Sequence, residues 1–219
     1  MASFVPQKKD VVAELAAEIL HNYERGRAIV AVDGLDGAGK TRFADDLAES
    51  LRKTGHAVFR ASIDGFHRPR ADRYLRGKDS PEGFYRDSYD YSVLRRVLVE
   101  PFRLGGSTAF VSAAFDHERD AQVEPKWLTG PADAILVIDG IFLNRPELRD
   151  LWNYSIWLDV PAKVADARLI ERDGRAAVGS RYTGGQALYV AEASPRTTAT
   201  AVIDNTDYDH PRRVFADSR

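Results

Sequence analysis

Residues 34–41 have the types and spacing of a phosphate-binding loop. Gly34, Gly39, Lys40 and Thr41 match the pattern G-x-x-x-x-G-K-[ST], and Gly37 adds a third glycine. Glycines allow several backbone N–H groups to point at one anion, and the N-terminus of the helix that follows adds a positive dipole. Lys40 is therefore expected to reach the β- and γ-phosphates of a nucleotide, and the Thr41 hydroxyl is expected to bind Mg²⁺.

Two aspartates follow segments that have the composition of strands. Asp139 follows the continuous apolar run 134–138, which suits a strand buried on both faces. A carboxylate at that place is the usual partner of Mg²⁺. Asp64 follows a predicted strand over 56–63. Its carboxylate could accept the proton of an alcohol that receives a phosphoryl group, although an aspartate before a glycine could also only form a turn.

A series of arginines follows in the last third of the chain. Arg168, Arg172 and Arg175 have the spacing i, i+4 and i+7 and fall on one side of a predicted helix, and Arg181 follows in a glycine-flanked loop. In a mobile lid over 168–185, such side chains would stabilise the charge of a transferring phosphoryl group. The alternative is a solvated helix face whose arginines pair with neighbouring carboxylates.

Strand-like and helix-like segments alternate along most of the chain, which predicts an α/β fold with a mostly parallel sheet and helices on both faces. The predicted strands are 28–32, 56–63, 134–138, 154–160 and 201–203. The predicted helices are 6–25, 40–53, 89–103, 146–151, 161–173 and 186–193. Residues 68–87 and 179–185 are predicted as loops, and 108–115 with 121–127 as a hairpin.

Composition limits the class of protein. The chain has 219 residues, a net charge of −2 and no cysteine. This length suits one domain with a sizeable core, and the charge indicates neither nucleic-acid nor membrane binding. A chain without disulfides or thiolate metal sites fits a reducing cytoplasm. The N-terminus lacks the long apolar stretch of a signal peptide. A homo-oligomer is compatible with the sequence.

Five motifs in this order resemble the uridine kinase, phosphoribulokinase and pantothenate kinase group of P-loop kinases, and the uridine kinase branch above all. The motifs are GLDGAGKT from Gly34, DGFHR from Asp64, FDHER from Phe115, VIDGIFL from Val137 and RLIERDGR from Arg168. The resemblance extends from residue 28 to about residue 207. It implies a P-loop NTPase-type sheet in a single kinase domain over 1–219, with a substrate-side insertion at about 65–127.

The resemblance also implies roles for individual residues. Asp64 would act as the base for a sugar hydroxyl, and Phe66 and His67 would line a nucleoside pocket. Hairpin residues would also contact the nucleoside: Phe115, His117 and Arg119. The spacing in this hairpin is compressed, Phe115 replaces a tyrosine of the family, and Asp139 stands where uridine kinases often have glutamate. These departures affect the identity of the acceptor more than the type of reaction.

The predicted function is Mg²⁺-dependent transfer of the γ-phosphoryl group of ATP to a hydroxyl of a small molecule, with uridine or cytidine as the first candidates. The whole loop would bind the nucleotide: Gly34, Leu35, Asp36, Gly37, Ala38, Gly39, Lys40 and Thr41. Arg168 and Arg181 are also assigned to the nucleotide, and Lys40, Asp64, Arg172 and Arg175 to catalysis. Thr41 and Asp139 are assigned to the metal.

Several alternatives stay open. The acceptor could be a pantothenate-like compound, a sugar or a nucleoside monophosphate. The chain could also be a nucleotide-binding regulator, or a kinase that has lost turnover. Asp72-Arg73-Tyr74 spells a thymidylate kinase signature, but it lies in a polar segment instead of after an apolar strand, so we interpret it as coincidence. The Asn-Lys-x-Asp motif with which GTPases bind guanine does not occur.

Overall fold

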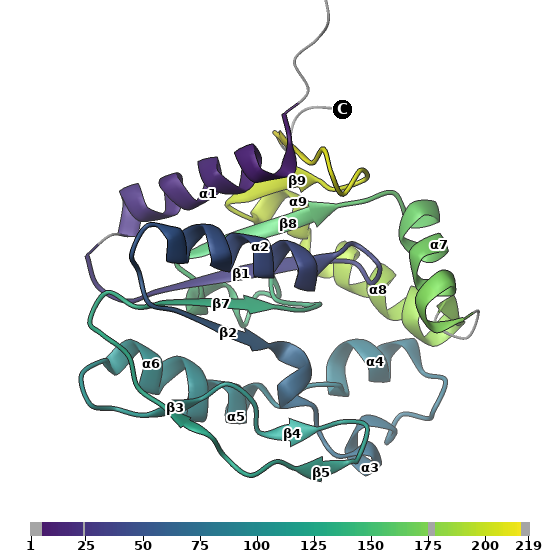
Figure 1. Cartoon of the computed structure of the whole chain (residues 1–219). Coiled ribbons are helices and arrows are strands. Elements are labelled where there is room, and N and C mark those ends of the chain that lie inside the picture. The colour runs from purple at the N-terminus through teal and green to yellow at the C-terminus, as the bar shows by residue number, and fades with distance from the viewer. Residues whose placement is uncertain (1–5, 24, 175–177, 216–219) are drawn as a thin grey trace, which may run out of the picture.

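The computed structural model describes residues 6–23, 25–174 and 178–215, and it has a central sheet between two layers of helices (Figure 1). The strands of the sheet lie in the order β10-β9-β8-β1-β7-β2. Their bounds are β1 (Ala28–Gly34), β2 (Val58–Ser62), β7 (Ile135–Asp139), β8 (Tyr154–Asp159), β9 (Ala201–Asp204) and β10 (Arg212–Val214). Neighbouring strands are parallel except for β10, which is antiparallel to β9. The predicted α/β sheet is therefore confirmed.

The side chains of β1 alternate between the two faces of the sheet. Val30 and Val32 pack with α1 (Lys8–Tyr23) and α2 (Lys40–Lys53). Ile29 and Ala31 pack in the core on the opposite face. All four side chains are completely buried, which explains why the sequence of the strand is a continuous apolar run and not an alternating pattern.

Most of the remaining helices cover the face opposite α1 and α2 or lie near the carboxyl ends of the strands (Figure 1). Their bounds are α3 (Arg70–Arg73), α4 (Pro81–Asp87), α5 (Tyr91–Leu94), α6 (Glu100–Leu104), α7 (Ala162–Asp173), α8 (Ser180–Ala193) and α9 (Pro195–Thr198). A π-helical segment, Arg95–Val99, joins α5 to α6 before Pro101, which has no N–H to donate. No helix in the described ranges is long and apolar enough to span a membrane.

The prediction of a loop over 68–87 is wrong, because this segment contains α3 and α4. The helix α4 begins with Ser80 as its N-cap, whose hydroxyl accepts a hydrogen bond from the Gly83 N–H at 3.0 Å. Pro81 follows at the first helical position, where it needs no hydrogen-bond partner. Gly77 and Gly83 obscured this start signal in the sequence.

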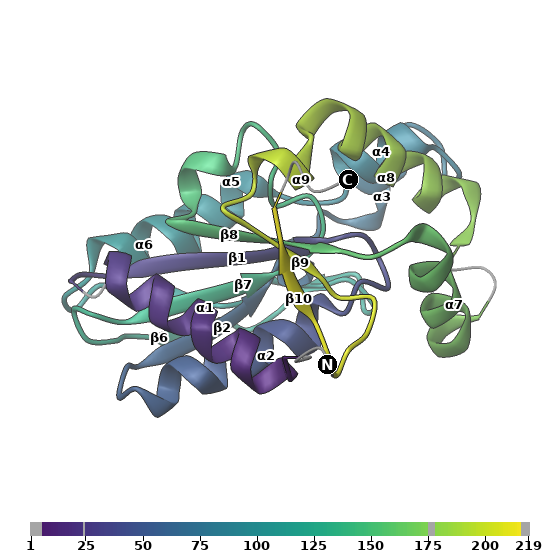
Figure 2. The same ribbon diagram turned by 90° about the horizontal axis from the view of Figure 1, so that it is seen from above.

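The predicted loop over 179–185 is also wrong, because α8 already begins at Ser180. Gly184 and Gly185 lie inside this helix, which runs beside α4 (Figure 2). A Cβ on Gly184 would lie 2.8 Å from Pro81, and one on Gly185 would lie 2.6 Å from the Phe84 ring. These glycines therefore serve close helix packing and not a turn.

The predicted hairpin is confirmed, with shorter strands than expected. β3 (Phe110–Val111) pairs with β6 (Trp127–Leu128), and β4 (Phe115–Asp116) pairs with β5 (Ala121–Gln122). The predicted helix over 146–151 is a 3₁₀ turn at Arg149–Leu151. The strand β10 was not predicted, because it lies in a polar stretch of the chain.

The strand register brings the chemically interesting residues to one edge of the sheet. Asp139 at the end of β7 is level with Val32 in β1 and with Ser62 in β2. The phosphate-binding loop follows β1, and Asp64 lies two residues after Ser62. In open α/β sheets, ligands bind at this carboxyl edge.

Candidate active site

The phosphate-binding loop joins β1 to α2 and is covered on its outer side by other parts of the chain. Gly37 and Gly39 have φ values of 78° and 88°, which only glycine adopts without strain. A Cβ on Gly37 would lie 2.3 Å from the Ala165 carbonyl oxygen, and one on Gly39 would lie 2.4 Å from the Tyr208 ring. The glycines are therefore required by backbone conformation and by close packing against α7 and the segment that follows β9.

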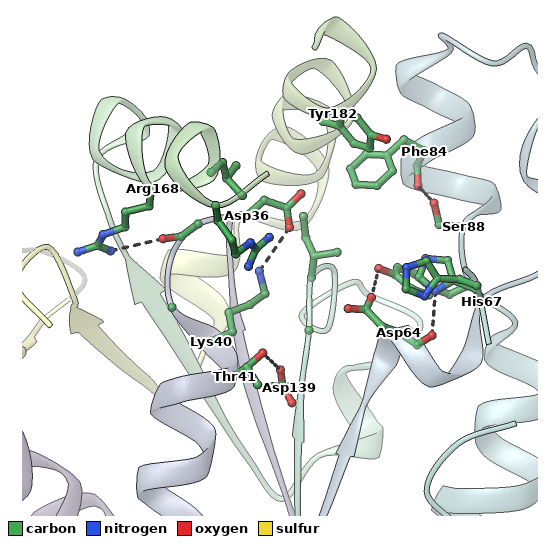
Figure 3. Close-up of a pocket in the computed structure, with 18 of the residues that line it drawn as sticks. Asp36, Lys40, Thr41, Asp64, His67, Phe84, Ser88, Asp139, Arg168 and Tyr182 are labelled. Carbon is green, nitrogen blue, oxygen red and sulfur yellow. Dashed lines mark hydrogen bonds and ion pairs between the residues drawn. The ribbon is translucent and has the colours of Figure 1, made fainter. Parts of the chain in front are cut away.

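Lys40 is held inside the loop. Its ammonium donates to the Leu35 carbonyl oxygen at 3.0 Å and lies 3.5 Å from Oδ1 of Asp36 (Figure 3). Its side chain is 13% exposed. The Asp36 N–H donates in turn to the side chain of Gln186 in α8 at 2.9 Å. Because most of the Lys40 side chain is already shielded from solvent, an anion that binds in this loop would contact a largely desolvated ammonium group.

Thr41 and Asp139 form the oxygen-rich part of the site. The Thr41 hydroxyl donates to Oδ2 of Asp139 at 2.7 Å, and Asp139 is 2% exposed. A hydroxyl and a carboxylate are hard oxygen donors of the kind that Mg²⁺ binds together with phosphate oxygens and water. No cluster of three or more acidic or histidine residues that could hold a metal occurs in the described ranges. The Thr41 hydroxyl and the Asp139 carboxylate fit a Mg²⁺ ion that also binds the phosphate oxygens of a nucleotide.

Arg60 in β2 also contacts Asp139, and the sequence analysis did not identify it. Its Nη2 lies 2.8 Å from Oδ1 of Asp139, and its Nε lies 2.9 Å from Oδ1 of Asp45 in α2. Its Nη1 donates to the Val137 carbonyl oxygen at 2.7 Å. Arg60 thereby connects the helix that carries Thr41 to the strand that carries Asp139.

Asp64 lies in a 3₁₀ turn directly after β2 and is exposed to the cavity (Figure 3). The Tyr89 hydroxyl donates to Oδ1 of Asp64 at 3.0 Å. The Asp64 carbonyl oxygen accepts from Nδ1 of His67 at 2.9 Å. The second carboxylate oxygen of Asp64 has no protein donor in the described structure, so it is available to a ligand.

His67 stacks on His117 with ring centroids 4.7 Å apart and an interplanar angle of 26°. Burial lowers the pKa of the His67 imidazole; the hydrogen bond to the Asp64 carbonyl oxygen and the Asp64 charge oppose this shift, and the smaller effects of His117 and Arg73 add to it. His67 is therefore expected to be neutral at pH 7.

A single cavity of about 540 Å³ connects these groups. The phosphate-binding loop and Asp139 line one part of it, and Asp64 and His67 line another (Figure 3). His117, stacked on His67, also lines the cavity. Aromatic side chains that the sequence analysis did not assign complete the wall: Tyr74, Phe84, Tyr89, Tyr182 and Tyr208. Three of them come from segments that were interpreted as loops, which is why the pattern did not identify them.

Three residues predicted to contact a nucleoside do not line this cavity. Phe66 is 1% exposed and belongs to the core on the sheet face opposite α1 and α2. Phe115 pairs through its backbone in the hairpin and is absent from the cavity wall. The Arg119 side chain is 85% exposed and lies 3.5 Å from Asp116 on the hairpin surface.

The predicted lid arginines differ in their contacts. Arg168 donates to the Thr206 carbonyl oxygen at 2.7 Å and lies 3.6 Å from the Tyr208 ring centroid. Arg172 lines the cavity and pairs with Asp173 at 2.6 Å. Arg175 lies outside the described residues.

Arg181 does not occupy a glycine-flanked loop, because it lies in the first turn of α8 and is 9% exposed. It donates to the carbonyl oxygens of Lys78 and Ser80, both at 3.1 Å. Its guanidinium group therefore holds the segment before α4 instead of extending toward the phosphate-binding loop.

Comparison with known proteins supports the assignment of the fold and of the phosphate-binding loop. No protein-family model matches the chain. A uridine kinase of Ligilactobacillus salivarius is 24% identical over 152 residues, which are 69% of either chain. A solved structure described as a possible uridine kinase from Bacillus stearothermophilus superposes with a TM-score of 0.71 at 27% identity, and the match covers 89% of this chain and 97% of that one.

A D-glycerate 3-kinase from Cryptococcus neoformans superposes with a TM-score of 0.54 at 11% identity, and the match covers 85% of this chain and 86% of that one. At this identity the likeness concerns the fold alone. Together with the geometry of the loop, these matches confirm that the chain has the α/β fold of P-loop kinases and resembles uridine kinases in sequence.

Proposed function

We propose that this chain is an ATP-dependent small-molecule kinase that transfers the γ-phosphoryl group to a hydroxyl of its acceptor. The observation that carries this proposal is that Lys40 and Asp64 line the same cavity, on the two sides of the space in which a phosphoryl group would move. A nucleotide switch needs the first residue but has no use for a carboxylate that faces an acceptor.

The proposed transfer of the γ-phosphoryl group is a balanced reaction. The acceptor oxygen forms a bond to the γ-phosphorus, the bond between that phosphorus and the β–γ bridging oxygen breaks, and ADP leaves. The proton of the acceptor hydroxyl passes to the free carboxylate oxygen of Asp64, while Tyr89 holds the other oxygen in place.

Positive and polar groups on the nucleotide side stabilise the charge that develops in this step. Lys40 and the loop N–H groups stabilise the oxygens of the transferred group. Thr41 and Asp139 would hold Mg²⁺, which neutralises charge on the β- and γ-phosphates. Arg172, and Arg175 of the predicted lid, are the candidates for additional charge stabilisation.

Uridine and cytidine are the first acceptors to test. The named sequence relative is a uridine kinase, and the aromatic side chains around Asp64 offer surfaces on which a base could stack. A sugar, a pantothenate-like compound or a nucleoside monophosphate are the other acceptors to include.

A coupled ADP-release assay with ATP, Mg²⁺ and this panel tests the proposal. Asp64→Asn should lower acceptor-dependent release by about 10²–10⁴-fold, the range typical of a lost general base. Arg96→Met, at an exposed arginine that does not line the cavity, is the matched control and should leave release unchanged. ADP release that is independent of every acceptor and unchanged in Asp64→Asn would instead identify a nucleotide-binding regulator.

A further inference from the structure

Arg73, at the end of α3, is a partly buried cation in the acceptor part of the cavity. Its side chain is only 11% exposed and it lines the cavity together with Asp64 and His67. Its Nε is completely buried and has no hydrogen-bond partner among the described residues. A buried guanidinium N–H without a partner is costly, since it has lost its hydration without a replacement.

The nearest carboxylate compensates this charge poorly. Nη2 of Arg73 lies 3.4 Å from Oδ1 of Asp120, whereas charge-assisted hydrogen bonds measure about 2.7–2.9 Å. The same oxygen already accepts the Arg70 N–H at 2.7 Å. The ring of Tyr74 lies 5.9 Å from the guanidinium carbon, near the limit of a cation–π contact. Nε itself is closed to solvent, but Nη1 has no hydrogen bond among the described residues and Nη2 has only this long one, so the exposed part of the guanidinium keeps donor capacity at the cavity wall.

Arg181 provides an internal comparison, because it is a more deeply buried arginine that lines the same cavity. Its donors are used by main-chain carbonyl oxygens, among them those of Lys78 and Ser80. It also lies 3.4 Å from the Arg73 carbonyl oxygen. Arg181 thus stabilises the segment that presents Arg73, while Arg73 itself remains incompletely paired.

We infer that the acceptor carries an anionic group, a carboxylate or a phosphate, which Arg73 binds while Asp64 receives the acceptor hydroxyl. A planar guanidinium forms short paired hydrogen bonds with either oxyanion. Since Asp64 would repel an anion, the charged group belongs at the Arg73 end of the cavity and the hydroxyl at the Asp64 end. His67 lines the same cavity, and because burial lowers its pKa it is not expected to compete as a cation at pH 7.

This inference rests on the proposed kinase activity and narrows its acceptor to hydroxy acids or phosphorylated alcohols. A plain nucleoside has no such group. The anionic acceptor and the uncharged nucleoside are therefore two outcomes that one experiment can separate.

The experiment compares matched acceptors in the ADP-release assay. The pairs are pantothenate with pantothenol, D-glycerate with glycerol, and ribose 5-phosphate with ribose, and uridine and cytidine are added as uncharged nucleosides. We expect one charged member to exceed its neutral partner in kcat/KM by roughly 10–100-fold, the range for a hydrogen bond to a charged group. The carboxylate and phosphate pairs show which anion the site selects.

Arg73→Met should remove this preference by raising KM for the charged acceptor, with little change for the neutral one. Arg73→Lys should restore part of it, because it returns the charge without the planar pair of donors. Arg96→Met should behave as the wild type. A wild-type enzyme that uses uridine or cytidine better than every charged compound, or an Arg73→Met variant with an unchanged preference, would overturn the inference while leaving the kinase activity established.

If no acceptor supports turnover, the thermal unfolding midpoint with ADP and Mg²⁺ present still decides the question. ADP occupies the phosphate-binding loop, so that anions are directed to the acceptor site. Stabilisation by the charged compounds that is lost in Arg73→Met would support the anion site independently of the kinase activity. No difference between the wild type and Arg73→Met for any charged compound would reject it.

Discussion

Arg60 and Asp139 form an ion pair between β2 and β7, with Nη2 2.8 Å from Oδ1. The other oxygen of Asp139 accepts the Thr41 hydroxyl. Both carboxylate oxygens are thus occupied by protein donors. Asp139 is therefore held in one orientation, with its Thr41 side directed to the place where Mg²⁺ would bind.

Replacing Arg60 should weaken the metal site. In Arg60→Met we expect the apparent affinity for Mg²⁺ to fall by roughly 10–100-fold, as is typical when the partner of a metal-binding carboxylate is removed. Arg60→Lys should recover part of the loss. Titration with Mn²⁺ in the presence of ADP, followed by electron paramagnetic resonance, measures this without turnover. Unchanged Mn²⁺ affinity in Arg60→Met would show that Thr41 alone orients the carboxylate.

Asp33 is a completely buried carboxyl at the end of β1, and it joins α8 to the base of the phosphate-binding loop. It accepts hydrogen bonds from the Tyr189 hydroxyl and from the backbone and side chain of Asn144. Burial raises the pKa of Asp33, and the hydrogen bonds from Tyr189 and Asn144 oppose this rise. A raised pKa in the folded state means that ionised Asp33 costs stability as the pH rises above about 3.9, its value in an unfolded chain.

Tyr189→Phe should therefore destabilise the protein by about 1–3 kcal/mol, because it removes a donor from a buried carboxylate. Without that donor the pKa of Asp33 should rise further, so the destabilisation should be larger at pH 7 than at pH 5. Urea unfolding of both proteins at the two pH values measures this difference. A destabilisation that is equal at both pH values would indicate that Asp33 does not change its protonation state between pH 5 and pH 7 in either protein.

The sequence predicted the elements whose signals are local. The apolar runs of β1 and β7 next to glycines, and the loop between Gly34 and Thr41, are recognisable without knowing what lies beside them. The strand order then places Asp139 and Asp64 at the same edge of the sheet. The assigned catalytic and binding roles of these residues remain predictions.

The features of the fold and the site that the sequence did not predict depend on contacts between distant segments. Arg60 matters only because β2 lies beside β7, and no local pattern contains that information. Gly184 and Gly185 indicated a loop, but their role is to admit α4. Tyr208 lies in a polar segment near the end of the chain, and its contact with the loop arises only when β9 joins the sheet.

The contact between Arg168 and Tyr208 predicts an effect on nucleotide binding. The guanidinium of Arg168 packs on the ring at 3.6 Å and also lies 3.4 Å from the Gly37 carbonyl oxygen. Arg168→Met should release the segment that covers the loop and raise the Kd for ATP about tenfold, consistent with the loss of a charged hydrogen bond. Calorimetry measures this. Tyr208→Phe retains the ring and should bind ATP like the wild type.

A variant of Arg181 tests whether this residue supports the wall of the acceptor site or binds the phosphates of the nucleotide. Because its donors bind the carbonyl oxygens of Lys78 and Ser80, Arg181→Met should loosen the segment that carries Arg73 and Tyr74. We expect KM for the acceptor to rise by roughly tenfold or more, while the Kd for ATP stays within about twofold of the wild-type value. Limited proteolysis should cut this segment faster in the variant. If instead the Kd for ATP rises and the acceptor KM does not, Arg181 acts on the nucleotide side of the cavity and not as a wall of the acceptor site.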